Sequence, residues 1–153
     1  MDIPLWQKVL GAIIYLLPWS DAIPFGAFLF NDIPQLQWLV IPAIPIIFIQ
    51  NAIPFGGIIL FFILFLSIVR SPKASYFLKF NTLQAILIDI GIIITGLAFQ
   101  ILFKPLGSSL IISTLSSTIL IGALAMTSFS IWKCLQGEEP DLPGISEAVR
   151  MQL

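Results

Sequence analysis

One aspartate lies inside an apolar segment, where an ionisable side chain is unusual. Asp89 follows Lys79 by ten residues, or roughly 15 Å at about 1.5 Å per helical residue. A carboxyl group at that depth in a bilayer is costly, and by default it marks a functional site. No basic residue falls at a comparable depth. Asp89 is therefore expected either to be a neutral acid that joins helices or to serve a conducting path.

The residues around Asp89 divide into two faces when the segment is drawn as a helix. Asn81, Gln84, Asp89 and Gln100 share one half of the wheel with several small residues. We expect this half to face protein or internal water. The opposite arc is continuously apolar and is expected to face lipid or a partner; it includes Leu83, Ile86, Ile90, Leu97 and Ile101.

Two further charged residues belong to the candidate set. Asp21 interrupts the first apolar run, where it either pairs with Lys104 or caps the helix that follows Pro18. Arg70 closes the second apolar run. The candidate functional polar residues are Asp21, Arg70, Asn81, Gln84, Asp89 and Gln100.

The absence of some residue types excludes several kinds of chemistry. The chain has no histidine and one cysteine, Cys134. A Ser-His-Asp triad, Cys-His catalysis and the usual zinc sites are therefore excluded, as is an intramolecular disulfide. We predict no catalytic residues, no metal, no cofactor and no enzyme activity. A net charge of −1 gives no electrostatic basis for binding nucleic acid.

Composition indicates an all-α integral membrane protein. Hydrophobic residues make up 58% of the 153 residues and charged residues 10%, and so few charges do not coat a soluble globule of this size. A spanning helix needs roughly 20 apolar residues. Four transmembrane helices are predicted, at about 5–30, 53–69, 80–103 and 110–132.

A fifth apolar stretch, 36–49, is expected not to span. Its 14 residues would reach only about 21 Å as a helix, and Pro42 and Pro45 each remove a backbone donor. We predict a short interfacial or re-entrant segment, packed over the far ends of the helices. The membrane domain then covers 1–135, and 136–153 forms a polar tail whose last residues make a short helix.

Charge placement predicts the orientation. With four spans, six of the seven bases lie on the side of both termini, and only Lys104 lies on the other. The positive-inside rule then places both termini and the loop 71–75 in the cytoplasm or stroma. A fifth span would put Lys8 opposite the bases of that loop.

Short repeated patterns offer packing signals. The hexapeptide 21–26 recurs at 51–56, and in both an Asx residue precedes a proline by three, which favours two similarly capped helix starts. In the fourth span, small residues repeat every four positions and predict close helix contacts. They form two stripes: Ser109, Ser113 and Ser117, and Thr114, Thr118 and Gly122.

Several stretches also resemble a known membrane-protein family. They are Tyr15-Leu16-Leu17-Pro18 with Asp21 and Pro24-Phe25-Gly26, Arg70 followed by Phe80-Asn81-Thr82-Leu83-Gln84-Ala85-Ile86-Leu87-Ile88-Asp89-Ile90, and the tail Ile145–Gln152. They resemble the twenty-kilodalton subunit of the protein translocon at the chloroplast inner envelope. The resemblance implies a four-span import subunit with both termini in the stroma. No transit peptide precedes the first span, so by resemblance we expect a cyanobacterial or plastid-encoded member.

Three functions stay open at this point. The first is an import-translocon subunit that forms or scaffolds a protein-conducting path. The second is a non-channel scaffold or assembly factor for another membrane complex. The third is a small-solute or ion transporter that uses Asp89. Four spans enclose little space, so the first and third require partner subunits or a homo-oligomer; membrane lipid surrounds the chain in every case.

Overall fold

The computed structural model describes residues 2–106 and 109–153, which are helical with no β-strand among them. The expected all-α class is confirmed. In chain order the elements are α1 (Leu5–Ile14), α2 (Leu16–Ala22), the 3₁₀ turn η1 (Ile23–Gly26), α3 (Ala27–Asp32), the 3₁₀ helix η2 (Pro34–Ala43), α4 (Ile44–Ala52), α5 (Gly56–Leu64), the π turn η3 (Phe65–Val69), α6 (Tyr76–Phe103), the 3₁₀ turn η4 (Lys104–Leu106), α7 (Leu110–Leu135) and α8 (Ile145–Gln152).

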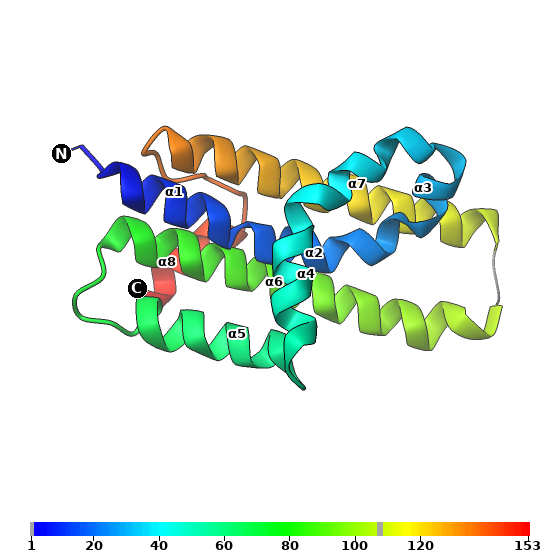
Figure 1. Cartoon of the computed structure of the whole chain (residues 1–153), viewed down its shortest axis with the longest axis horizontal. Helices are drawn as coiled ribbons and strands as arrows, with labels where there is room; N and C mark the ends of the chain where they lie inside the picture. The colour runs from blue at the N-terminus through cyan, green and yellow to red at the C-terminus, as the bar shows by residue number, and fades with distance from the viewer. Residues whose placement is uncertain (1, 107–108) are drawn as a thin grey trace.

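Two long helices, α6 and α7, set the length of the molecule (Figure 1). Their mean hydropathies are 2.3 and 1.9, and at about 1.5 Å per residue both exceed the roughly 30 Å of bilayer hydrocarbon. A serine begins each helix. Ser75 accepts a hydrogen bond from the Leu78 N–H, and Ser109 accepts one from the Ile112 N–H, at 3.2 Å each. These bonds satisfy backbone donors that a helix start leaves free.

The N-terminal segment, α1 and α2, packs against both long helices and completes the core. Its inner side chains, such as Tyr15 and Leu17, are almost fully buried. The helix is interrupted at Tyr15 because Pro18 has no N–H to donate to the Ile14 carbonyl. It continues through η1 and α3, so that Leu5–Asp32 forms one apolar helical stretch long enough to cross a membrane.

The helical stretches after α3 differ in length from the predicted ones. Four helical stretches are long and apolar enough to span, as expected, but the set includes Pro34–Ala52, whereas Gly56–Val69 is shorter. The helical stretch extends beyond the 14 residues of the apolar run, and the prolines do not end it. Pro42 lies in a 3₁₀ helix, and Pro45 lies in the first turn of α4, where a missing N–H costs little.

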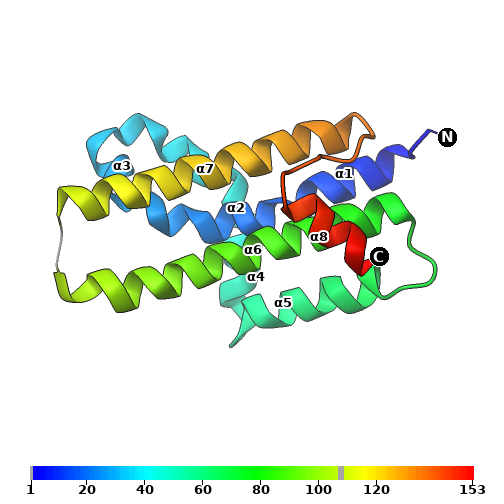
Figure 2. The ribbon, with the colours of Figure 1, turned by 180° about the vertical axis from the view of Figure 1, so that it is seen from behind.

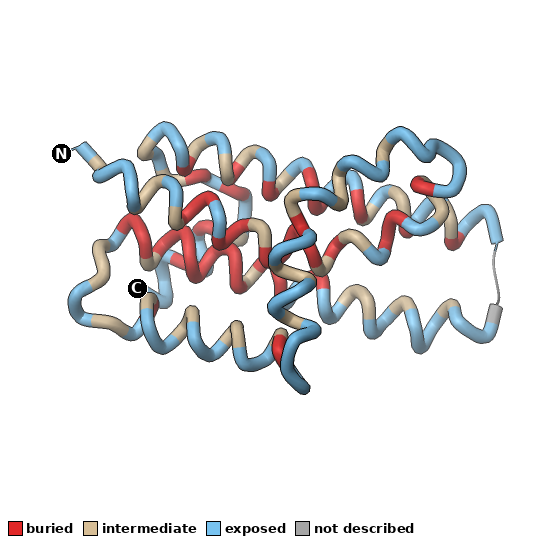
Figure 3. Tube along the Cα trace, viewed as in Figure 1, coloured by how far each residue is buried: buried red, intermediate tan, exposed pale blue. Residues whose placement is uncertain are grey.

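The stretch η2–α4 also does not lie flat over the helix ends. Figure 1 shows α4 running across the long axis of the bundle, and α5 beginning near the middle of the bundle and following only half of it. Gln50 of α4 donates to Asp21 Oδ1 at 3.2 Å, which fixes the end of α4 beside α2. Most of η2 and α4 is exposed (Figure 3).

The two hexapeptides end helices and do not cap new ones. Residues 21–22 end α2 and residues 51–52 end α4, and neither Asp21 nor Asn51 makes a side-chain cap. The reason is the proline that follows, since Pro24 and Pro54 cannot continue the helical ladder. After the second break, Phe55 takes a left-handed conformation with φ 58° and α5 begins at Gly56.

Both termini and the loop 70–75 lie at one end of the bundle, here called the proximal end (Figures 1 and 2). The fold therefore permits the arrangement that charge placement predicts, with these three segments on one side of a membrane. The side itself, cytoplasmic or stromal, stays a prediction.

The polar tail is docked on the bundle. Residues 138–144 cross from α7 to α6, and α8 packs on α6 (Figure 2). Leu142, Ser146 and Val149 are buried there. The short C-terminal helix is present, but Arg150 forms ion pairs with Glu139 at 3.8 Å and Asp141 at 3.3 Å, and none with Glu147.

Candidate functional site

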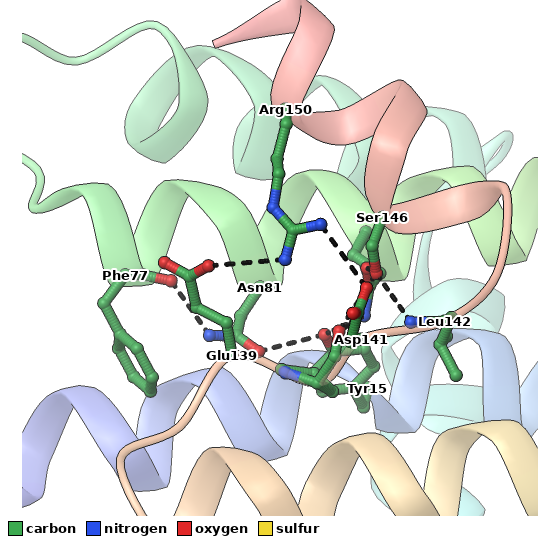
Figure 4. A network of polar contacts seen from close by, with 10 residues as sticks. Tyr15, Phe77, Asn81, Glu139, Asp141, Leu142, Ser146 and Arg150 are labelled. Atoms are coloured by element: carbon green, nitrogen blue, oxygen red, sulfur yellow. Dashed lines mark hydrogen bonds and ion pairs between the residues drawn. The ribbon is translucent and has the colours of Figure 1, made fainter.

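The first cluster of polar side chains joins α1 to α6, and we call it the tail-docking network (Tyr15, Asn81, Gln84 and Ser146; Figure 4). The Tyr15 hydroxyl donates to Asn81 Oδ1 at 2.9 Å, and Asn81 Nδ2 donates to the Phe77 carbonyl at 2.9 Å. Gln84 Nε2 donates to the Tyr15 hydroxyl oxygen at 3.3 Å. Asn81 and Gln84 are fully buried, so both lie against protein as the helical wheel predicted.

The same network holds the C-terminal tail. Gln84 Nε2 donates to the Pro140 carbonyl at 3.0 Å, and its Oε1 accepts from the Ser146 hydroxyl at 2.6 Å. Ser146 Oγ in turn accepts from the Leu142 N–H at 2.7 Å. Gln84 thus uses both ends of its amide, and the fully buried Ser146 supplies the partner. A buried network in which each polar group is bonded fixes one geometry.

Arg150 lies over the outer side of this network (Figure 4). Besides its two ion pairs, its guanidinium carbon lies 5.3 Å from the centre of the Phe80 ring. Arginine is 40% exposed here, so the ion pairs are modest contributions. The cation–π contact adds a link between α8 and α6.

The second cluster lies halfway along α6, and we call it the carboxyl pair (Asp21 and Asp89). The two carboxyl groups are neighbours, Asp21 on α2 and Asp89 on α6. Asp89 is 5% exposed, and its Oδ1 has no hydrogen-bond partner among the described residues. Gln50 donates to Asp21 from the other side.

This arrangement replaces the expected Asp21–Lys104 alternative. Within residues 2–106 and 109–153, Asp21 forms no ion pair with Lys104, and it does not cap a helix. No base lies on α2 or α4. The carboxyl pair, with the Gln50 amide, is therefore a junction of three helices that carries acid groups and no opposing charge.

Gln100 belongs to neither cluster. It is exposed and lines a groove of about 430 Å³ along the second half of α6, which Asp21 also lines. The groove is flanked by Ser116 of α7, whose hydroxyl donates to the Phe25 carbonyl at 2.6 Å. Arg70 is in neither cluster; it lies at the proximal end, beside Lys79.

Only part of the apolar arc of α6 is exposed. Leu83 and Ile86 are buried, because they pack against η3, α5 and Val149 of the tail. Leu97 and Ile101, beyond the reach of α5, are exposed. The helical wheel separated the two faces of α6 correctly, but it did not show that α5 covers only the first half of the apolar face.

The two small-residue stripes of the fourth predicted span do not form the face that packs on the core. Thr114, Thr118 and Gly122 are exposed, and Thr118 bonds to the carbonyl four residues earlier in its own helix. The residues that face the core include Ser116, Leu120, Thr127 and Ser130. The four-residue spacing showed that these small residues share a side of α7, but it did not show whether that side faces the core or the exterior.

Sequence reasoning missed three residues that bond to the predicted ones, namely Tyr15, Gln50 and Ser146. None of the three was among the candidate functional residues. The single available signal was a phenol inside an apolar run, since a buried Tyr hydroxyl usually needs a partner. Ser146 meets Gln84 across 62 residues, and no local pattern predicts such a contact.

No metal or cofactor site is assigned. The described residues contain no group of three or more His, Cys, Asp or Glu side chains placed to hold a metal ion. The polar groups in both clusters are amides, hydroxyls and two carboxyls. Their arrangement can join helices, and at the carboxyl pair it can hold a proton.

Comparison with known proteins gives one consistent result. The family model described as "Chloroplast import apparatus Tic20-like" matches residues 3–149. The chain is 35% identical over 148 residues to a Tic20 family protein of Synechocystis sp., covering 96% of this chain and 92% of that protein. It is 31% identical to protein TIC 20-v, chloroplastic, of Arabidopsis thaliana, covering 96% and 71%. It is 30% identical to the Tic20 family protein Ycf60 of Gracilaria tenuistipitata var. liui, covering 99% and 78%.

Proposed function

Because this chain belongs to the Tic20 family, we propose that it is an integral membrane subunit of a protein-import translocon. In this proposal it forms or scaffolds a protein-conducting path with partner subunits, in a plastid inner envelope or a cyanobacterial membrane. Both termini face the stroma or cytoplasm. The family name describes an import apparatus, and the names of the relatives describe no catalytic activity, so we propose no enzyme function.

The observation that carries the scaffolding part is the burial of the α6 amides. Asn81 and Gln84 were the polar residues best placed to line a path. Both are fully buried and bonded within the chain. They hold α1, α6 and the tail together, so this half of the bundle acts as a rigid support.

The surface left for a path lies along the second half of α6. The groove there carries the Asp21 carboxyl and the Gln100 amide among apolar and aromatic side chains. One chain supplies only one wall of such a groove. We therefore place partner subunits, or further copies of this chain, opposite it.

Crosslinking tests this placement. A photo-reactive amino acid at Gln100 should form adducts with a partner subunit or a substrate arrested during import. The matched control is Ile94, which is exposed on the other face of the same helix. Equal adducts at both positions, or none at Gln100, would contradict a path wall at the groove.

Two other functions each have one supporting observation. The buried Oδ1 of Asp89, which has no hydrogen-bond partner among the described residues, favours a small-solute or ion transporter. The tail-docking network, whose amides are hydrogen-bonded within the chain, favours a non-channel scaffold or assembly factor. Co-purification in mild detergent separates the three: translocon subunits support the proposal, photosynthetic subunits support an assembly factor, and a homo-oligomer alone supports a transporter.

A further inference from the structure

A pocket at the proximal end combines basic side chains with an apolar floor. Its volume is about 310 Å³, and it lies between η3, the start of α6 and the end of α8. Phe65, Val69 and Leu83 supply the apolar lining. Val69 and Leu83 are themselves buried in the small core beneath α8. The floor is therefore a packed surface, which gives the pocket a fixed shape.

Gln152 and Leu153 at the end of α8 also line the pocket, and three further polar side chains lie on its rim. Arg70 and Lys79 bring two positive charges, and Tyr76 brings a hydroxyl. Arg70 lies at the end of a π turn, where its backbone N–H donates to the Phe65 carbonyl at 3.0 Å. π turns are often found at functional sites. Lys79 faces the same space from the first turn of α6, where its backbone N–H donates to the Ser75 carbonyl at 3.0 Å.

Neither base forms an ion pair with another described residue. Across residues 2–106 and 109–153, the ion pairs use Lys133 and Arg150, and none involves Arg70 or Lys79. Neither of these two side chains donates a hydrogen bond to a described residue, and no Asp or Glu lines the pocket. Two unpaired positive charges beside a hydroxyl form a site for an anion.

The surroundings indicate which anion fits. Arg70 closes the apolar helix α5–η3, whose outer face exposes Phe62 and Leu66. The basic rim therefore lies where hydrocarbon gives way to headgroups. Basic pockets between membrane helices at this level recognise anionic headgroups. A free phosphate would use the rim alone, whereas a phospholipid would use the rim and the apolar floor together.

We propose that this pocket binds an anionic phospholipid. The phosphate is held by the Arg70 guanidinium, which offers two parallel donors, and by the Lys79 ammonium as a point charge. Tyr76 donates its hydroxyl to a further phosphate or glycerol oxygen. The beginning of an acyl chain lies on Phe65, Val69 and Leu83.

Native mass spectrometry of the full chain in detergent tests this site. The protein is titrated with phosphatidylglycerol, with phosphatidylcholine, or with inorganic phosphate as a competitor. We expect phosphatidylglycerol to bind at least about tenfold more tightly than phosphatidylcholine, because the choline ammonium of phosphatidylcholine brings a positive charge against Arg70 and Lys79. Millimolar inorganic phosphate should displace little of the lipid, because it gains nothing from the apolar floor.

Single variants locate the effect. Arg70→Gln and Lys79→Gln should each weaken phosphatidylglycerol binding about tenfold. The matched control, Lys73→Gln, removes a base from the same loop region but outside the pocket, and it should leave binding unchanged. Arg70→Lys keeps the charge and the topology signal, and it should lose part of the affinity because the paired donors are lost.

Three results would overturn the proposal. They are equal binding of the two lipids, unchanged binding in both Gln variants, and full displacement by inorganic phosphate, which would identify a free-anion site. Circular dichroism on every variant shows whether the helices are intact. If Arg70→Gln fails to fold, Lys79→Gln and Arg70→Lys still decide the question.

Discussion

The side chain of Asp89 distinguishes a structural acid from a proton-linked one. Asp89 is buried beside Asp21, and an amide in place of the Asp89 carboxyl offers both donor and acceptor. We expect Asp89→Asn to keep thermal stability within about 1 kcal/mol. Asp89→Leu should lose about 1–3 kcal/mol, because Asp21 is left without this buried partner. Thermal unfolding in detergent, followed by circular dichroism, measures both.

A functional assay on the same variant separates the competing roles. Normal folding together with normal import would identify Asp89 as a neutral acid that joins helices. Normal folding with lost activity would contradict that assignment and favour a role in moving protons or cations.

Gln84 and Gln100 form a matched pair on one helix. Gln84 is fully buried and bonds to the tail, whereas Gln100 is exposed. Gln84→Leu should destabilise the protein by about 1–3 kcal/mol, since Ser146 and the Pro140 carbonyl lose buried partners. Gln100→Leu should change stability by less than about 0.5 kcal/mol. The same unfolding measurement applies, and equal effects would contradict the tail-docking network.

At the scale of elements, the attachment of α8 is testable by proteolysis. Ser146→Ala removes the hydroxyl that links α8 to Gln84. Arg150 is the only base of the tail, so trypsin cleavage after it reports opening of the tail. We expect cleavage about 5- to 30-fold faster, which corresponds to a loss of about 1–2 kcal/mol.

A variant on the same helix provides the control. Glu147 is exposed, and its side chain forms no ion pair or hydrogen bond within the described part of the chain. Glu147→Ala should leave the cleavage rate near that of the wild type. Equal acceleration in both variants would mean that helix propensity, and not the bond to Gln84, holds the tail.

The turn between α4 and α5 depends on one glycine. A Cβ at Gly56 would lie 2.1 Å from the Gln50 carbonyl oxygen, and that backbone atom cannot move aside freely. Gly56→Ala should destabilise the protein by about 1–3 kcal/mol. At Gly91 a Cβ would have no described atom within 4 Å. Gly91→Ala should therefore be neutral or stabilising by up to about 1 kcal/mol, and thermal unfolding compares the two.

At the scale of the whole molecule, the orientation can be measured by cysteine labelling. In a Cys134→Ser background, single cysteines at positions 35 and 73 report opposite ends of the bundle. We expect position 73 to react from the cytoplasmic or stromal side, because six of the seven bases gather there. Position 35 should react from the other side. Labelling of both from one side would require a different path for Pro34–Val69.

Sequence and structure contributed differently to the two clusters. The polar half of the α6 wheel could be predicted because a regular helix fixes which residues share a face. Asn81, Gln84 and Asp89 are indeed buried on that half. Their partners could not be predicted, since Tyr15, Asp21 and Ser146 come from other elements and no local pattern encodes which helix lies opposite.

The sequence by itself determined the helical membrane class, the two long helices and the gathering of bases at one end. These follow from composition, from the length of apolar runs and from charge placement, which are properties of segments. The tertiary structure decided the course of η2, α4 and α5. Proline effects depend on whether a carbonyl four residues earlier still needs a donor, and a 3₁₀ helix or a first turn removes that need. It also decided that the polar tail is docked, because burial of Leu142, Ser146 and Val149 depends on a surface built by α6 and α1.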